Sequence, residues 1–101
     1  MKIFLDDIRN TPDGWVRCYW PDEVLSLLDT YLVEEISLDH DLGDDNHGTG
    51  YDVLLRMEEM SRFGQLKYLP KITIHSANPV GKQKMLIAIC KIKEYYDQNR
   101  N

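Results

Sequence analysis

Short apolar runs alternate with amphipathic stretches along the chain, and this alternation predicts the secondary structure. Four β-prone runs predict strands at residues 2–5, 15–19, 35–38 and 71–74. Apolar residues at helical spacing predict helices over about 21–32, 50–63 and 79–96. Strands that alternate with helices form βαβ units, so we expect a largely parallel sheet with right-handed crossovers and helices on both faces.

The connection between the first two strands is the exception to this alternation. Residues 6–14 are too few and too polar to hold a helix, which leaves an antiparallel pairing of these two strands open. No repeat, low-complexity tract or linker-like segment divides the 101 residues. We therefore expect one α/β domain over residues 1–101.

Acidic residues directly follow two of the predicted strands. Asp6 and Asp7 come after the first strand, and Asp39 and Asp41 come after the third. Because the carboxyl ends of parallel strands meet at one edge of a sheet, and neighbouring strands lie only ~4.8 Å apart, these carboxylates can converge. A divalent cation such as Mg²⁺ or Mn²⁺ would relieve their repulsion, so we predict a metal site. The alternative is that the four acids are solvated loop residues and helix caps.

Two histidines lie at the same predicted edge. His40 follows the third strand and His75 follows the fourth, and the imidazole group gives or takes a proton near neutral pH. We predict that they form an acid–base pair for phosphoester cleavage, in which one activates water and the other protonates the departing alkoxide. Which histidine is the acid stays open, as does a structural role for each. His47, in the polar loop, is expected to be exposed to solvent.

Three further features could contact a phosphate group. Arg9 could bind a phosphate with two parallel hydrogen bonds, and an ion pair with Asp6 or Asp13 is the alternative. The turn Gly48-Thr49-Gly50 leads into a helix N-terminus, whose free N–H groups suit an anion, and a tight turn with an N-cap is the simpler interpretation. Asn78 lies beside the second histidine and is a candidate for the same ligand.

Three motifs resemble the receiver domain of two-component response regulators. They are Phe4-Leu5-Asp6-Asp7, Leu38-Asp39 before a glycine-containing loop, and Ile74-His75-Ser76-Ala77. The resemblance implies that Asp6, Asp7 and Asp39 bind Mg²⁺, that Asp41 offers its backbone carbonyl to the metal, and that Ser76 contacts phosphate. The sequence predicts neither the fifth strand of the receivers nor its phosphate-binding lysine. We therefore do not expect ordinary phosphoryl-aspartate signalling.

A wider set of motifs resembles the cyclic-phosphate processing receiver-like family. The motifs are LDDxRxxP at 5–12, SLDHDLG at 37–43, GTGYD at 48–52 and HSANP at 75–79. The resemblance implies a small receiver-like (flavodoxin-like) fold, with four mostly parallel strands and about three helices. It also implies phosphodiesterase-type processing of a cyclic phosphate, at a cyclic nucleotide or an RNA 2′,3′-cyclic end, with histidines added to the acidic site. Two alternatives stay open, a sensor that binds such a ligand unchanged and a module that only binds partners.

Composition bears on which ligands the protein can bind and on where in the cell we expect it. The formal net charge of −5 disfavours non-specific binding to DNA or RNA backbones. No apolar run is long enough to span a membrane, and the first residues turn acidic too early for a secretory signal, so we expect a cytoplasmic protein. Cys18 and Cys90 are expected to be reduced thiols in the core.

Overall fold

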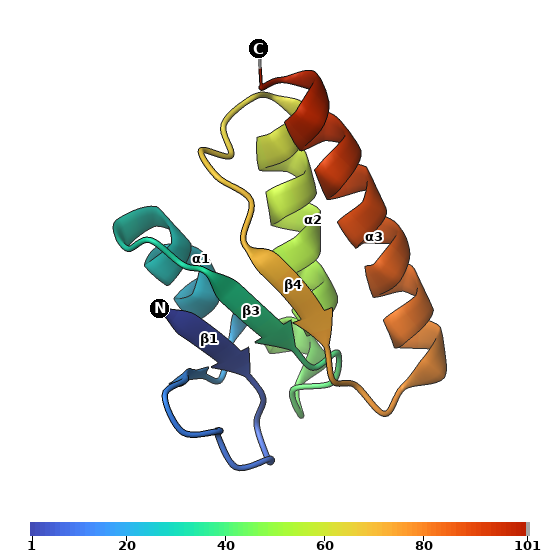
Figure 1. Cartoon of the computed structure of the whole chain (residues 1–101). Helices are drawn as coiled ribbons and strands as arrows, with labels where there is room; N and C mark the ends of the chain where they lie inside the picture. Colours follow the sequence, from blue (N-terminus) through green and yellow to red (C-terminus); the bar gives the residue numbers. More distant parts are fainter. Residues whose placement is uncertain (101) are drawn as a thin grey trace.

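The computed structural model describes residues 1–100 as a four-stranded sheet with three α-helices and one short 3-10 helix (Figure 1). The elements follow in the order β1 (Lys2–Leu5), β2 (Val16–Cys18), α1 (Pro21–Thr30), β3 (Glu35–Leu38), η1 (Asp45–His47), α2 (Gly50–Arg62), β4 (Lys71–Ile74) and α3 (Pro79–Gln98). The predicted α/β fold is confirmed, and the ends of the predicted strands and helices shift by no more than two residues.

The helices begin where the sequence supplies starting signals. Pro21 occupies the first turn of α1, and the side chain of Glu23 accepts hydrogen bonds from two preceding backbone N–H groups. The carboxylate of Asp52 accepts the N–H of Thr49 at the start of α2, and the side chain of Asn78 accepts an N–H at the start of α3. These contacts satisfy N–H groups that have no partner inside the helix.

All neighbouring strands in the sheet are parallel, in the order β2-β1-β3-β4. The antiparallel pairing that the sequence left open for the first two strands is therefore excluded, because Ile3 lies opposite Val16 and Leu5 opposite Cys18 in a parallel register. A strand of four residues is only about 13 Å long at ~3.3 Å per residue, so a short extended loop can return along it without a helix.

The three helices pack against one face of the sheet, so the expectation of helices on both faces is wrong (Figure 1). The crossovers from β2 to β3 and from β3 to β4 run in the same direction across the sheet, and right-handed crossovers then place α1 and α2 on the same face. Helix α3 packs beside α2. The connection from β1 to β2 runs the opposite way, which places the loop 6–15 over the other face.

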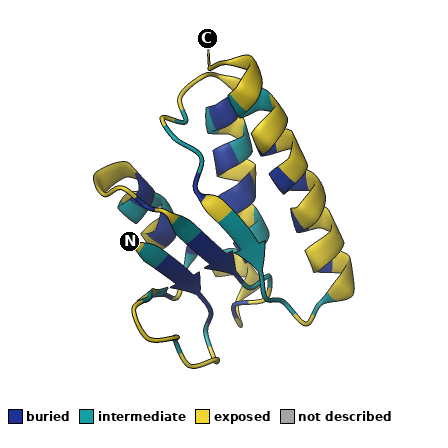
Figure 2. Cartoon of the chain, viewed as in Figure 1, coloured by how far each residue is buried: buried dark blue, intermediate teal, exposed yellow. Residues whose placement is uncertain are grey.

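The hydrophobic core lies between the sheet and these helices (Figure 2). Its sheet side comes from alternate positions of the two central strands, which are Ile3, Leu5, Ile36 and Leu38. Its helix side is built by Val24, Leu28, Val53, Leu54, Met57, Met85, Ala88, Ile89 and Ile92. Burying a side chain of the Leu, Ile or Val type contributes about 1.5–3 kcal/mol. No helix within residues 1–100 combines the length and apolar character needed to cross a bilayer.

The two cysteines are free, as expected, but only one of them is in the core. Cys18 is buried, and burial together with the nearby charge of Glu23 raises the pKa of its thiol to about 11. Cys90 is exposed on α3, so the expectation of a core thiol is wrong at that position. The hydrophobic core therefore does not include Cys90.

Candidate functional site

The carboxyl ends of β1, β3 and β4 meet around a cavity of about 330 Å³, here called the strand-end pocket. It is lined by Asp6, Asp7, Ile8, Arg9, Asp39, Asp41, Gly43 and Ala77. Asp6, Asp39 and His75 are each the first residue after a strand, and their backbone N–H groups still bond the last carbonyl of the neighbouring strand. The sheet itself therefore fixes where these three side chains start.

Asp6 is the most tightly held acid of the strand-end pocket. Its side chain is 1% exposed, and its Oδ1 accepts the backbone N–H groups of Ile8 at 2.8 Å and Arg9 at 2.9 Å. Burial acts to raise the pKa of Asp6, but these two backbone hydrogen bonds and the contact with His75 outweigh it, so the pKa lies below its usual value. Asp6 is therefore a buried, ionised carboxylate at neutral pH.

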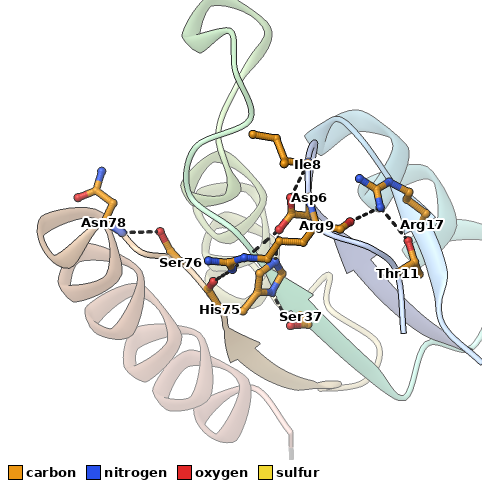
Figure 3. A network of polar contacts seen from close by, with 9 residues as sticks. All are labelled: Asp6, Ile8, Arg9, Thr11, Arg17, Ser37, His75, Ser76 and Asn78. Atoms are coloured by element: carbon orange, nitrogen blue, oxygen red, sulfur yellow. Dashed lines mark hydrogen bonds and ion pairs between the residues drawn. The ribbon is translucent and has the colours of Figure 1, made fainter. Parts of the chain in front are cut away.

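His75 is held on three sides. Its Nε2 lies 2.9 Å from Oδ2 of Asp6, and its Nδ1 lies 2.6 Å from Oγ of Ser37 (Figure 3). The imidazole also stacks on the ring of Phe4, with ring centroids 4.4 Å apart and planes 4° from parallel. Both ring nitrogens therefore have a partner, and the plane of the ring is fixed.

Asp6, Asp39 and His75 form a group that could hold a metal ion. Each offers one ligand atom, and these atoms lie within 4.8 Å of one another. Carboxylate oxygens and an imidazole nitrogen are ordinary ligands of divalent cations, so this donor set fits the predicted metal. The other two predicted ligands, Asp7 and Asp41, line the same pocket but lie outside this group.

His40 has different surroundings from His75. Its Nδ1 lies 2.8 Å from Oδ1 of Asp41, whose Oδ2 accepts a hydrogen bond from Nδ2 of Asn78 at 3.3 Å. The ring rests on Gly81, where a Cβ atom would come within 2.6 Å of it. The hydrogen bond from His40 chiefly holds the pKa of Asp41 below its usual value. Within residues 1–100, no hydrogen bond joins His40 to His75, and each histidine has its own carboxylate partner, Asp41 for His40 and Asp6 for His75.

The predicted phosphate-binding side chains are partly engaged within the protein. The guanidinium group of Arg9 donates to the backbone carbonyl of His75 and lies 3.9 Å from Oδ2 of Asp6, which is the first of its two possible ion-pair partners. The hydroxyl of Ser76 accepts the N–H of Asn78 at 3.1 Å. These contacts place Arg9 at the wall of the strand-end pocket and hold the start of α3 close to it.

The turn 48–50 is held close to the end of β3. Thr49 is the N-cap of α2, as the simpler interpretation of this turn required. At Gly50 a Cβ atom would lie 1.8 Å from the backbone oxygen of Asp39, so only glycine fits there. Gly48 lines a different hollow, between α1 and the loop 44–48, in which His47 is exposed as predicted and stacks on Trp20.

The sequence interpretation missed two residues that support His75. Ser37 and Phe4 lie opposite each other on β3 and β1, on the face without helices. The signal in the sequence is the position of Ser37, a polar residue between two apolar ones in a buried strand. Alternation along the strand turns it away from the core, but only the pairing of strands shows that His75 lies above it.

Comparison with known families agrees with the fold. The model of the cyclic-phosphate processing receiver domain matches residues 1–91, a range that includes all strands and every residue of the strand-end pocket. No curated protein and no solved structure gave a significant match. The family match covers more than half of the chain. The protein therefore belongs to the cyclic-phosphate processing receiver domain family.

Proposed function

We propose that the protein hydrolyses a cyclic phosphodiester at the strand-end pocket, with a divalent cation, Mg²⁺ or Mn²⁺, held there by its acids. The observation that carries the proposal is the convergence of Asp6, Asp39 and His75, in a chain of this family. The substrate class would be a cyclic nucleotide or an RNA end carrying a 2′,3′-cyclic phosphate.

The acids of the pocket give the cation a fixed place. Asp6 is buried and ionised, and Asp39 offers a second carboxylate from the adjacent strand. Asp7 and Asp41 lie at the same pocket and add negative charge around it. When bound, the cation would offset the charge of the phosphoryl oxygens and make a nearby water more acidic. Arg9, at the pocket wall, would add a positive charge toward the phosphate.

His40 is the residue that we assign to proton transfer. Asp41 occupies its Nδ1, whereas its Nε2 has no hydrogen-bond partner among the described residues and is not fully buried. In the hydrolysis, the oxygen of a water would form a new bond to phosphorus and lose a proton to solvent, and one ester P–O bond of the ring would break. The leaving alkoxide would take a proton from Nε2 of His40 while Asp41 holds the ring in place, and a proton from solvent would then restore His40.

Turnover is the test that separates this proposal from a sensor. Cyclic mononucleotides, cyclic dinucleotides and RNA with a cyclic-phosphate end would each be incubated with the protein, with and without Mg²⁺ or Mn²⁺. We expect a linear phosphomonoester or phosphodiester product that requires the cation. Asp39→Asn should abolish product, and Asp29→Asn, which changes an exposed acid on α1, should not. A ligand that binds and is recovered unchanged would contradict hydrolysis and favour a sensor.

A further inference from the structure

We propose that His75 is a metal ligand, and that the cation site therefore prefers a first-row transition ion such as Mn²⁺ to Mg²⁺. The inference rests on the proposed function only in using the same cation site. It gives His75 a role different from that of His40, and it assigns a positioning role to Ser37.

The distance between His75 and Asp6 is the first argument. Nε2 of His75 lies 2.9 Å from Oδ2 of Asp6. Two adjacent ligands of an octahedral ion, each about 2.1 Å from it, are about 3.0 Å apart. The pair therefore already has the spacing of neighbouring ligands. The ligand atom of Asp39 lies within 4.8 Å of both, which a small side-chain adjustment converts to a third ligand position.

The second argument is the partner of the other ring nitrogen. Histidines that bind metals almost always donate their second N–H to a neighbouring group, which fixes the tautomer and the orientation of the ring. Nδ1 of His75 has such a partner in Oγ of Ser37, at 2.6 Å. A hydroxyl both donates and accepts, so Ser37 serves the ring whether the proton is on Nε2 or on Nδ1. The stack on Phe4 fixes the remaining freedom of the ring.

The third argument is that His75 is poorly suited to transfer protons. Both of its ring nitrogens have partners within the protein. A general acid or base needs a nitrogen that reaches the substrate or a water. In His75 the nitrogen nearest the pocket faces Asp6 instead. That position suits the coordination of a metal ion that Asp6 also binds.

The nature of the donor set determines which ion is preferred. Mg²⁺ favours oxygen ligands and keeps several of its waters, whereas imidazole nitrogen suits transition ions. A site made only of carboxylates would suit Mg²⁺. Replacing one oxygen by the nitrogen of His75 shifts the preference toward Mn²⁺, and further toward Co²⁺ along the usual order of affinities.

The test measures the ligand atoms and the affinities in the intact protein without substrate. Pulsed electron paramagnetic resonance of the Mn²⁺ complex detects a directly bound nitrogen, and calorimetry gives the affinities for Mn²⁺ and Mg²⁺. For the wild type we expect a nitrogen coupling and Mn²⁺ binding at least ~10-fold tighter than Mg²⁺ binding. His75→Gln should remove the coupling and lower Mn²⁺ affinity by ~10–100-fold, with little change for Mg²⁺.

Two more variants make the assignment specific. Ser37→Ala should keep the nitrogen coupling but lower Mn²⁺ affinity by ~10-fold, because the orienting partner of the ring is lost. His47→Ala, which changes an exposed histidine in another hollow, should leave both readouts unchanged. Thermal unfolding of each variant shows whether it is folded.

Failure of this inference is distinguishable from failure of the proposed function. If the wild type binds Mn²⁺ and Mg²⁺ equally and shows no nitrogen coupling, His75 is not a ligand, while an oxygen-only cation site and cation-dependent hydrolysis can still hold. A coupling that persists in His75→Gln also overturns the assignment. If neither cation binds the wild type, the cation site is wrong, and the proposed hydrolysis loses its cation.

Discussion

The two histidines near the strand-end pocket differ in almost every physical respect. His75 follows β4, both of its ring nitrogens have partners within 3 Å, and it stacks on Phe4 on the face of the sheet without helices. His40 follows β3 and rests on Gly81 of α3, and among the described residues only its Nδ1 has a hydrogen-bond partner. Equivalent places in the sequence have therefore produced a fixed imidazole and one with a free nitrogen.

This difference suggests how the two histidines divide the work of one site. A fixed ring whose nitrogen faces a buried carboxylate suits a metal ligand, because the ligand must not move. A ring with one nitrogen held by Asp41 and the other without a hydrogen-bond partner among the described residues suits proton transfer, because the proton must reach the substrate. The variants below test this division, beginning with the largest expected effect.

Removal of the His40 imidazole should affect turnover far more than binding. We expect His40→Ala to lower kcat by ~10²–10⁴-fold with little change in affinity for the cyclic phosphate or for Mn²⁺. Steady-state kinetics and calorimetry measure the two effects separately, with His47→Ala as the matched control. A near-normal kcat would show that His40 does not transfer the proton.

A change beside His40 should reproduce part of that loss. In Gly81→Ala the new Cβ would come within 2.6 Å of the His40 ring, so the ring must shift. We expect kcat to fall by ~10-fold while Mn²⁺ affinity stays unchanged, because the three atoms nearest the new Cβ all belong to His40 and none to the ligand group. The test compares the fold loss in kcat with the fold loss in Mn²⁺ affinity, each measured against the wild type. Equal losses in both would mean that the two histidines are not separate in function.

The sequence predicted the strands and helices, and the sheet edge at which the site lies. It did not predict which residues surround each histidine. Runs such as 2–5 and 35–38 are apolar and end at acids, so the strands follow from local pattern, whereas the convergence of Asp6 with Asp39 also needs the two strands to be parallel neighbours. The face covered by the helices depends on strand order and crossover direction, which are long-range properties. The contact of His75 with Ser37 likewise joins residues on different strands.

Acid should reveal the ionised state of Asp6 in the metal-free protein. Its pKa is lower in the folded protein than in the unfolded chain, where the usual value is 3.8. The unfolded state therefore binds more protons in this range, so Asp6 stabilises the fold above the unfolded pKa, and this stability is lost as the pH falls through the folded pKa. Urea unfolding from pH 6 down to pH 2 should show a steeper loss in the wild type than in Asp6→Asn. Parallel curves would contradict the assigned ionisation.

Removal of the Ser37 hydroxyl should have the smallest effect on folding. We expect Ser37→Ala to lower the free energy of unfolding by about 1 kcal/mol, the usual contribution of one hydrogen bond. Denaturant unfolding measures it, and Ser26→Ala on the exposed side of α1 is the control. A loss of several kcal/mol would mean that Ser37 supports the fold rather than the orientation of His75.

The central claim is that the acids at the strand ends hold a cation for opening a cyclic phosphate, and ³¹P NMR of one reaction tests it most directly. A nucleoside 2′,3′-cyclic phosphate would be followed with wild type and with Asp39→Asn, each with Mn²⁺ and with a chelator. We predict that the cyclic signal is replaced by a phosphomonoester signal only with wild type and Mn²⁺. Equal conversion by Asp39→Asn, or in the presence of the chelator, would contradict the claim.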